Sequence, residues 1–192
     1  MSLLNDYWEL SAPRPGERGY RPLGDVRPRL VPVYPSVAYD FCRRWHSKLP
    51  EPNFRGVMFC CGVELAGTLR AVALAGTPTA TWRTRCEQSA VLELTRIASD
   101  GSCLGAASML AARMIDLAAC RGPAWLFVTY SFIGERGTTY KALREKGLRP
   151  VARTRFRVRP HARDRDEVGD ESLKIRWEAG PLALPAKWEL LA

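Results

Sequence analysis

The chain has 192 residues, of which 46% are hydrophobic and 26% are charged, the balance of a globular protein with one full hydrophobic core. Its formal net charge of +9 at pH 7 favours polyanionic partners such as nucleic acid, although an arginine-rich composition would by itself make a chain basic. No apolar run approaches the roughly 20 residues of a membrane-spanning helix, and the N-terminus has no signal-peptide pattern, so we expect a cytoplasmic protein without a membrane partner.

The first part of the chain predicts an extended arm followed by strands around one helix. Residues 1–26 are rich in Pro, Gly and Arg and have no hydrophobic period, which indicates an extended basic arm. We assign 27–180 to one domain and 181–192 to a C-terminal tail. The elements expected before residue 90 are a strand at 29–33, a helix at 37–46, a hairpin of strands at 57–63 and 68–74, and a short strand candidate at 79–82.

The second part contains a strand, a turn, a helix and a buried strand, which is the order of a β–α–β unit. The order of all the elements, without an internal repeat, predicts the fold class α/β (α+β), with a mixed sheet. The elements expected here are a strand at 90–98, a turn at 99–103, a helix at 104–120, a strand at 124–130, a short helix at 138–146 closed by Gly147, and strands at 151–159 and 172–177.

The six cysteines show no spacing typical of a metal site. None lies in a CxxC pair, and only His46 and His161 are available as imidazole ligands. We therefore expect no metal and interpret the cysteines as reduced thiols, because nothing in the local sequence marks a nucleophile. They are Cys42, Cys60, Cys61, Cys86, Cys103 and Cys120.

The turn from Ser99 to Ser108 is the clearest candidate binding site. It leads directly into a helix rich in alanine, so unsatisfied backbone N–H groups and the positive end of the helix dipole lie there. Gly101 and Gly105 permit close approach of the backbone to a ligand, and Ser102 or Ser108 could add a hydroxyl donor. The pattern suits a pyrophosphate, but many such junctions bind nothing.

The order of the elements resembles the GNAT acyltransferase fold. The resemblance implies a mixed sheet of six to seven strands flanked by helices, in which the fourth and fifth strands separate around the pantetheine arm of acetyl-CoA or another acyl-CoA. Of the usual Q/R-x-x-G-x-G/A pattern only Gly105 and Ala107 fit here, and Ser102 stands where Gln or Arg is usual. The donor-binding residues that the resemblance implies are Ile97, Ala98, Ser99, Cys103, Leu104, Gly105, Ala106, Ala107 and Ser108.

A narrower resemblance covers about residues 37–178. The segments LELTRIASDG, GAASML, TYSFIGERGTTYKALREKGL and KIRWE resemble a phage-associated set of GNAT-like proteins named for the Mom DNA-modification protein of phage Mu. Such proteins modify adenine in phage DNA, so the resemblance implies a DNA partner, single-stranded or with a flipped base. The sequence departs from the set at Trp45, where His is more usual, and at the acid after the fifth strand.

Four residues are candidates for acid–base chemistry. Glu93 lies between Leu92 and Leu94, so it either lines a cleft with a raised pKa, useful for a base, or pairs with a cation. His46 has the most suitable ordinary pKa for proton transfer, but an imidazole at a helix end often caps carbonyl groups. The GNAT resemblance implies that Tyr140 protonates the leaving thiolate, unless it is a packed tyrosine. The Mom-type resemblance implies that Glu135 stands in for the acid that is missing after the fifth strand.

Basic and aromatic residues are candidates for contacts with nucleic acid. Alternating arginines in 153–159 predict a phosphate-tracking stripe or, equally, a solvated edge strand. Tryptophans at 45, 82 and 177 could stack on an unpaired base, although core packing is the commoner explanation. The predicted nucleic-acid contacts are Arg43, Arg44, Lys48, Arg96, Arg153, Arg155 and Arg157.

The leading hypothesis is a GNAT-like transferase that modifies a nucleobase, or an amine on a hypermodified base, in DNA from an acyl-CoA donor. Two alternatives stay open: a GNAT N-acetyltransferase that acts on a protein or small-molecule amine, and an inactive GNAT-like module that binds nucleic acid or assembles a complex. The sequence does not predict an oligomeric state.

Overall fold

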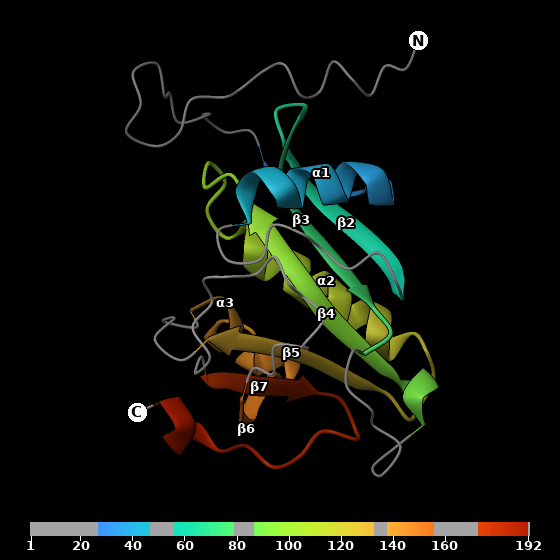
Figure 1. Ribbon diagram of the computed structural model, residues 1–192, viewed down its shortest axis with the longest axis vertical. Helices are drawn as coiled ribbons and strands as arrows, with labels where there is room; N and C mark the ends of the chain where they lie inside the picture. The colour runs from blue at the N-terminus through green and yellow to red at the C-terminus, as the bar shows by residue number, and fades with distance from the viewer. Residues whose placement is uncertain (1–26, 47–55, 79–86, 133–137, 156–172, 192) are drawn as a thin grey trace, which may run out of the picture. The chain divides into compact units, whose positions relative to one another are not determined.

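A computed structural model describes residues 27–46, 56–78, 87–132, 138–155 and 173–191. In this part of the chain seven strands form one sheet in the order β1-β2-β3-β4-β5-β7-β6, with helices beside it (Figure 1). The prediction of a mixed sheet of six to seven strands flanked by helices is therefore confirmed. The strands are β1 Arg29–Pro32, β2 Val57–Leu65, β3 Thr68–Gly76, β4 Val91–Ser99, β5 Leu126–Phe132, β6 Arg149–Arg155 and β7 Leu173–Ala179.

The helices begin and end where the sequence places its stop and start signals. Pro35 opens α1, where its missing N–H costs nothing, and Gly147 closes the turn before β6 with a left-handed φ of 78°. The short helix expected at 138–146 is divided into α3 and a 3-10 turn. The helices are α1 Pro35–Trp45, α2 Ala106–Ala119 and α3 Thr138–Lys141, and the 3-10 turns are η1 Gln88–Ala90, η2 Arg144–Lys146 and η3 Trp188–Leu191.

Two compact units divide the chain, and the first comprises Met1–Leu74 and Arg96–Leu110. Here α1 lies across β2 and β3 (Figure 1). The helix buries one face because its apolar residues recur at helical spacing, and this face packs against β3 and the end of β4. The buried residues of this core are Ala38, Tyr39, Phe41, Cys42, Val72, Leu74 and Ala98.

The second unit comprises Ala75–Thr95 and Ala111–Ala192. Its strands are β5, β7 and β6, together with the first half of β4, which pairs with β5 in parallel. That ladder joins Val91–Glu93 to Leu126–Val128 and stops there, although both strands continue.

The segment after β7, expected to be a tail, packs on the sheet of its own unit. Gly180 turns the chain with φ +111°, and Arg149 Nε donates to the Leu184 carbonyl at 2.8 Å. The Lys187 N–H donates to the Pro150 carbonyl on the edge strand β6 at 2.8 Å. The sequence missed these contacts because a Pro- and Ala-rich stretch carries no period. The strand candidate at 79–82, the arm at 1–26 and residues 156–159 lie outside the described residues.

Candidate functional site

The turn between β4 and α2 is shaped by two glycines and one aspartate. Gly101 and Gly105 have φ of 81° and 80°, a backbone region that other residues rarely adopt. Asp100 Oδ1 accepts hydrogen bonds from the Ser102 N–H at 2.8 Å and from the Ser102 hydroxyl at 2.6 Å. The Gly101 N–H donates to Ser99 Oγ at 3.1 Å, so side chains of the turn hold the turn itself.

The turn has room for a ligand on its backbone. Apart from the glycine itself and its chain neighbours, no atom of the described residues lies within 4 Å of the position where a Cβ would stand at Gly101 or Gly105. Leu104 is fully exposed, whereas Ala106, the first residue of α2, is buried. The helix continues for 14 residues, long enough for its N–H groups and dipole to favour an anion at this end. The residues present therefore fit a pyrophosphate that is held by backbone amides.

All nine predicted donor-binding residues lie on this feature, at the end of β4, in the turn or in the first turn of α2. Their side chains contribute little to the proposed binding of the donor, which depends on the backbone. Ala98 is 3% exposed and belongs to the core under α1. Cys103 is buried, and burial raises the pKa of its thiol, so it stays protonated and neutral.

A second group of polar residues lies on one face of the sheet in the other unit. Val128 on β5 is the register partner of both Glu93 on β4 and Glu178 on β7, and Tyr130 is the register partner of Arg176. Register partners project to the same side of a sheet, as do residues two apart on a strand, so the four polar side chains share a face. We call Glu93, Tyr130, Arg176 and Glu178 the polar cluster.

The polar cluster is buried and charged. Glu178 is 0% exposed and Glu93 is 5% exposed, and Arg176 Nε lies 3.0 Å from Glu178 Oε1. Glu178 Oε2 also accepts the Leu184 N–H at 2.9 Å, so the segment after β7 covers this carboxylate. Glu93 is buried mid-strand and lies on the face that carries Arg176, and its role as a base or as the partner of a cation stays a prediction.

Burial raises the pKa of the Tyr130 phenol to about 12, and the negative charges of Glu93 and Glu178 add to the effect against the opposing charge of Arg176. Its hydroxyl therefore carries a proton at any pH where the protein would work. Sequence reasoning missed Tyr130, Arg176 and Glu178. The signal was present in alternation: residues 128 and 130 share a face of one strand, as do 176 and 178 of the next.

Tyr140 lies on the other face. Its ring centroid is 5.5 Å from that of Trp177, which is fully buried and donates its indole N–H to Ser131 Oγ at 2.9 Å. Trp177 follows Arg176 and precedes Glu178 on β7, so it projects to the side opposite the polar cluster. Tyr140 and Glu93 are thus not brought together on one face. Trp177 is also wrong as a stacking platform, because no part of it reaches the surface.

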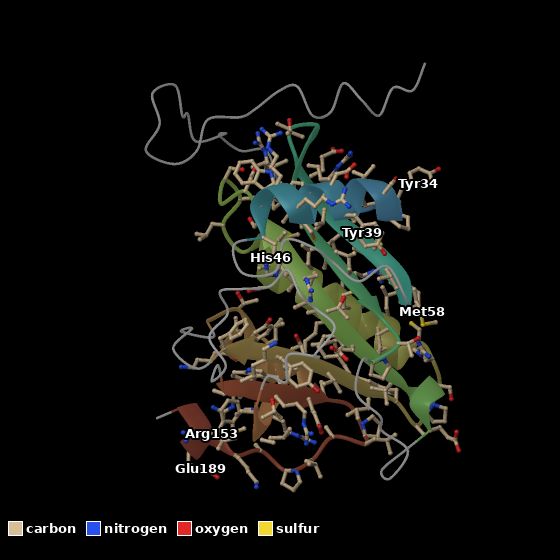
Figure 2. The ribbon with its side chains drawn as sticks, viewed as in Figure 1. Tyr34, Tyr39, His46, Met58, Arg153 and Glu189 are labelled. Atoms are coloured by element: carbon tan, nitrogen blue, oxygen red, sulfur yellow. The ribbon has the colours of Figure 1, made fainter. Side chains whose placement is uncertain are left out.

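His46 directly follows α1, as Figure 2 shows, and its backbone N–H donates to the Cys42 carbonyl at 2.8 Å. Burial, with the positive charge of Arg96, lowers the pKa of the imidazole to about 4. The expectation of proton transfer near neutral pH is therefore corrected, since His46 is neutral there and a weak base. Arg96 is half-buried in this unit, and its charge acts on His46 and Cys42 at the helix end.

Three of the other predicted contacts are exposed, and the rest lie outside the described part of the chain. On the exposed side of α1, Arg43 Nη1 lies 3.6 Å from Asp40 Oδ1. The guanidinium carbon of Arg44 lies 5.4 Å from the centroid of the Trp45 ring. Arg153 is exposed on the edge strand β6, on the same side of the picture as Glu189 (Figure 2). The side chain of Arg155 and the residues Lys48, Glu135 and Arg157 lie outside the described part, so these contacts stay predictions.

The cysteines of the described residues form no disulfide with one another. Burial raises the pKa of Cys42 to about 12 and that of Cys60 to about 11, which leaves no thiolate for nucleophilic chemistry at either position. Within the described ranges no group of metal-ligating side chains is close enough to hold an ion. No helix there is long and apolar enough to cross a membrane.

Comparison with known proteins identifies the fold. The sequence matches no protein-family model and no curated protein. The structure resembles the ribosomal-protein-S18-alanine N-acetyltransferase of Escherichia coli, with a TM-score of 0.55 and 14% identity over 84% of this chain and 97% of that one. It also resembles yncA of Salmonella typhimurium, solved with its cofactor acetyl-CoA, with a TM-score of 0.56 and 14% identity over 83% and 96%.

A third neighbour is an acetyltransferase of the GNAT family from Desulfovibrio desulfuricans, with a TM-score of 0.53 and 13% identity over 82% of this chain and 100% of that one. Each neighbour is covered almost completely, so the likeness includes the whole sheet and not one motif. The chain has the fold of the GNAT acetyltransferases.

Proposed function

We propose that the chain is an N-acyltransferase that uses an acyl-CoA donor. The observation that carries the proposal is the turn after β4, which offers open backbone at Gly101 and Gly105 and the N-terminus of a 14-residue helix within a GNAT fold. The donor supplies an acyl group activated as a thioester. Backbone amides from Cys103 to Ser108 hold its pyrophosphate, and the backbone of Ile97–Ser99 pairs with its pantetheine arm.

The polar cluster performs the proton transfers in this proposal. The Glu93 carboxylate removes a proton from the acceptor amine, and the Tyr130 hydroxyl, protonated because its pKa is about 12, gives a proton to the leaving sulfur. Arg176 balances the carboxylates on this face. Tyr130 replaces Tyr140 in this role because it shares a face with Glu93, whereas Tyr140 packs on Trp177.

For the acceptor we propose a nucleobase in DNA, or an amine attached to one. The support is the resemblance of LELTRIASDG and KIRWE to the Mom-type set and the net charge of +9. A second candidate is an amine on a protein, favoured by the likeness to an enzyme that acetylates an alanine of ribosomal protein S18. An inactive module that binds nucleic acid is the third.

Two measurements separate these functions. Calorimetry with acetyl-CoA should give binding that adenosine alone does not, and the absence of binding by any CoA species would remove the donor. Mass spectrometry of nucleosides from DNA incubated with protein and acetyl-CoA should show an added acyl mass. An unchanged digest, together with acylation of a peptide or small amine, would move the acceptor to the second candidate.

Salt dependence tests the DNA contact. Steep loss of DNA binding with salt, reduced in the double variant Arg155→Ala, Arg157→Ala, is expected if the arginine stripe tracks phosphates. The matched control is Arg29→Ala, an exposed arginine on β1 that is paired with Glu64 and is not among the predicted DNA contacts. Equal binding by both variants and the unaltered protein would exclude the stripe.

A further inference from the structure

A buried ion pair lies at the start of the turn after β4. Arg70 on β3 contacts Asp100 with 3.2 Å between Nη1 and Oδ2, and the two side chains are 8% and 9% exposed. The Asp100 N–H also donates to the Arg70 carbonyl at 3.0 Å. Side chain and backbone therefore fix the start of the turn to the neighbouring strand.

The same aspartate reaches into the turn with its other oxygen. Oδ1 accepts from both the N–H and the hydroxyl of Ser102, so one carboxylate connects the guanidinium to the position where GNAT patterns carry Gln or Arg. Arg70 has further donor capacity, since its Nε is buried without a hydrogen-bond partner among the described residues. The positive charge near the turn therefore comes from Arg70 on the neighbouring strand β3 and not from a residue of the turn.

A negative charge under a phosphate-binding turn would oppose the ligand. The segment from Ser99 to Leu110 contains Asp100 and has no Lys or Arg, so its only formal charge is negative. Arg70 offsets that charge at contact distance, where water is largely excluded and the offset is effective. Backbone amides can then act as the anion donors without repulsion from the carboxylate.

We propose that Arg70, acting through Asp100, is a positioning residue for the pyrophosphate of the donor. It takes the place of the Gln or Arg that GNAT patterns carry at the position of Ser102. The inference rests on the proposed acyl-CoA function. Arg70 holds the turn in the shape that presents its amides and cancels the charge of Asp100. The arm of the ligand beyond the pyrophosphate does not depend on it.

The test compares two ligands that differ in the pyrophosphate. Affinities for acetyl-CoA and for S-acetyl-pantetheine, which has no pyrophosphate, are measured on the full chain by calorimetry and, for weak binding, by NMR titration. Arg70→Met should weaken acetyl-CoA by roughly tenfold or more and leave acetyl-pantetheine within about twofold, the size of effect expected for a charge-assisted contact. Arg70→Lys, which keeps the charge, should recover part of the loss.

Two further variants guard against simple misfolding. Ser102→Ala removes only the hydroxyl bond to Asp100 and should weaken acetyl-CoA slightly, in the same direction. Arg29→Met removes an exposed arginine of β1 that pairs with Glu64 on β2, and it should change neither affinity. If Arg70→Met does not fold, Arg70→Lys and Ser102→Ala still give the comparison.

The outcomes are separable. Equal weakening of both ligands, or no weakening of either, overturns the role of Arg70 while the donor function stands. If the unaltered protein binds no acetyl-CoA, the proposed function fails first and this inference fails with it.

Discussion

Tyr130 on β5 is the register partner of Arg176 on β7, so a phenol and a guanidinium lie side by side on one face of the sheet. Two residues along each strand, Val128 pairs with Glu178. The ladder therefore builds a row of polar groups from residues that are distant in sequence. This arrangement makes the roles of the two tyrosines separable by experiment.

Tyr130→Phe should lower the turnover of acetyl-CoA by roughly 100-fold or more with little change in KM, because the variant removes the proton donor and keeps the ring. Tyr140→Phe is the matched control and should change turnover little, since its ring packing on Trp177 survives. Release of free CoA in the presence of the acceptor measures both. The reverse result would return the acid role to Tyr140, as the GNAT resemblance implies.

Removing one partner of the Arg176–Glu178 pair should destabilise the fold. Glu178→Gln leaves the Arg176 guanidinium, which is 19% exposed, without its balancing charge and should cost about 3 kcal/mol of unfolding free energy. Arg176→Met combined with Glu178→Gln should cost less than the two single changes together, because no isolated charge remains. Urea unfolding of the three variants gives the comparison, and strict additivity would contradict the coupling.

His46 should make stability depend on mildly acidic pH. Its pKa is near 6.5 in the unfolded chain and about 4 in the fold, so the unfolded state binds the proton first as pH falls. The stabilisation is fully present above pH 6.5 and is lost between pH 6.5 and about 4. His46→Gln should flatten the fall in melting temperature between pH 7 and 5, and His161→Gln, which changes the other histidine, serves as the control.

Thiol reactivity should follow burial. Cys120 is exposed, whereas Cys42 is fully buried and has a pKa of about 12. At pH 8 iodoacetamide should modify Cys120 rapidly and Cys42 only after unfolding, as peptide mass spectrometry would show. Rapid alkylation of Cys42 in the folded protein would contradict the packing of α1 on β3.

The sequence predicted the elements well where hydrophobic periodicity was strong. The helix after Pro35, the alternating strand around Glu93 and the turn at Gly101 all lie where the pattern put them. The partners of these elements were harder to predict, because strand order joins residues far apart in the chain. Glu93 and Glu178 share a face because both are register partners of Val128, and no short stretch of sequence predicts this. The same holds for the contact of Arg70 with Asp100, which are 30 positions apart.

The predicted imidazole base failed for a related reason. An ordinary pKa describes a solvated group, and only the packing of α1 shows that His46 is half-buried and feels the charge of Arg96. The Trp177 platform failed likewise, because its depth depends on strands that the sequence does not order. Burial is a property of the assembled sheet, and residue type alone predicts it poorly for polar and aromatic side chains.

The segment that follows Gly180 has a practical consequence for anyone who shortens or extends the protein. Deleting it would strip the Leu184 amide from the Glu178 carboxylate, uncover the polar cluster to water and free the edge of β6 at Pro150. Activity would then fall as if a catalytic residue had been changed, although the cause would be water that reaches the polar cluster. Affinity tags are therefore better placed before residue 1 than after residue 192.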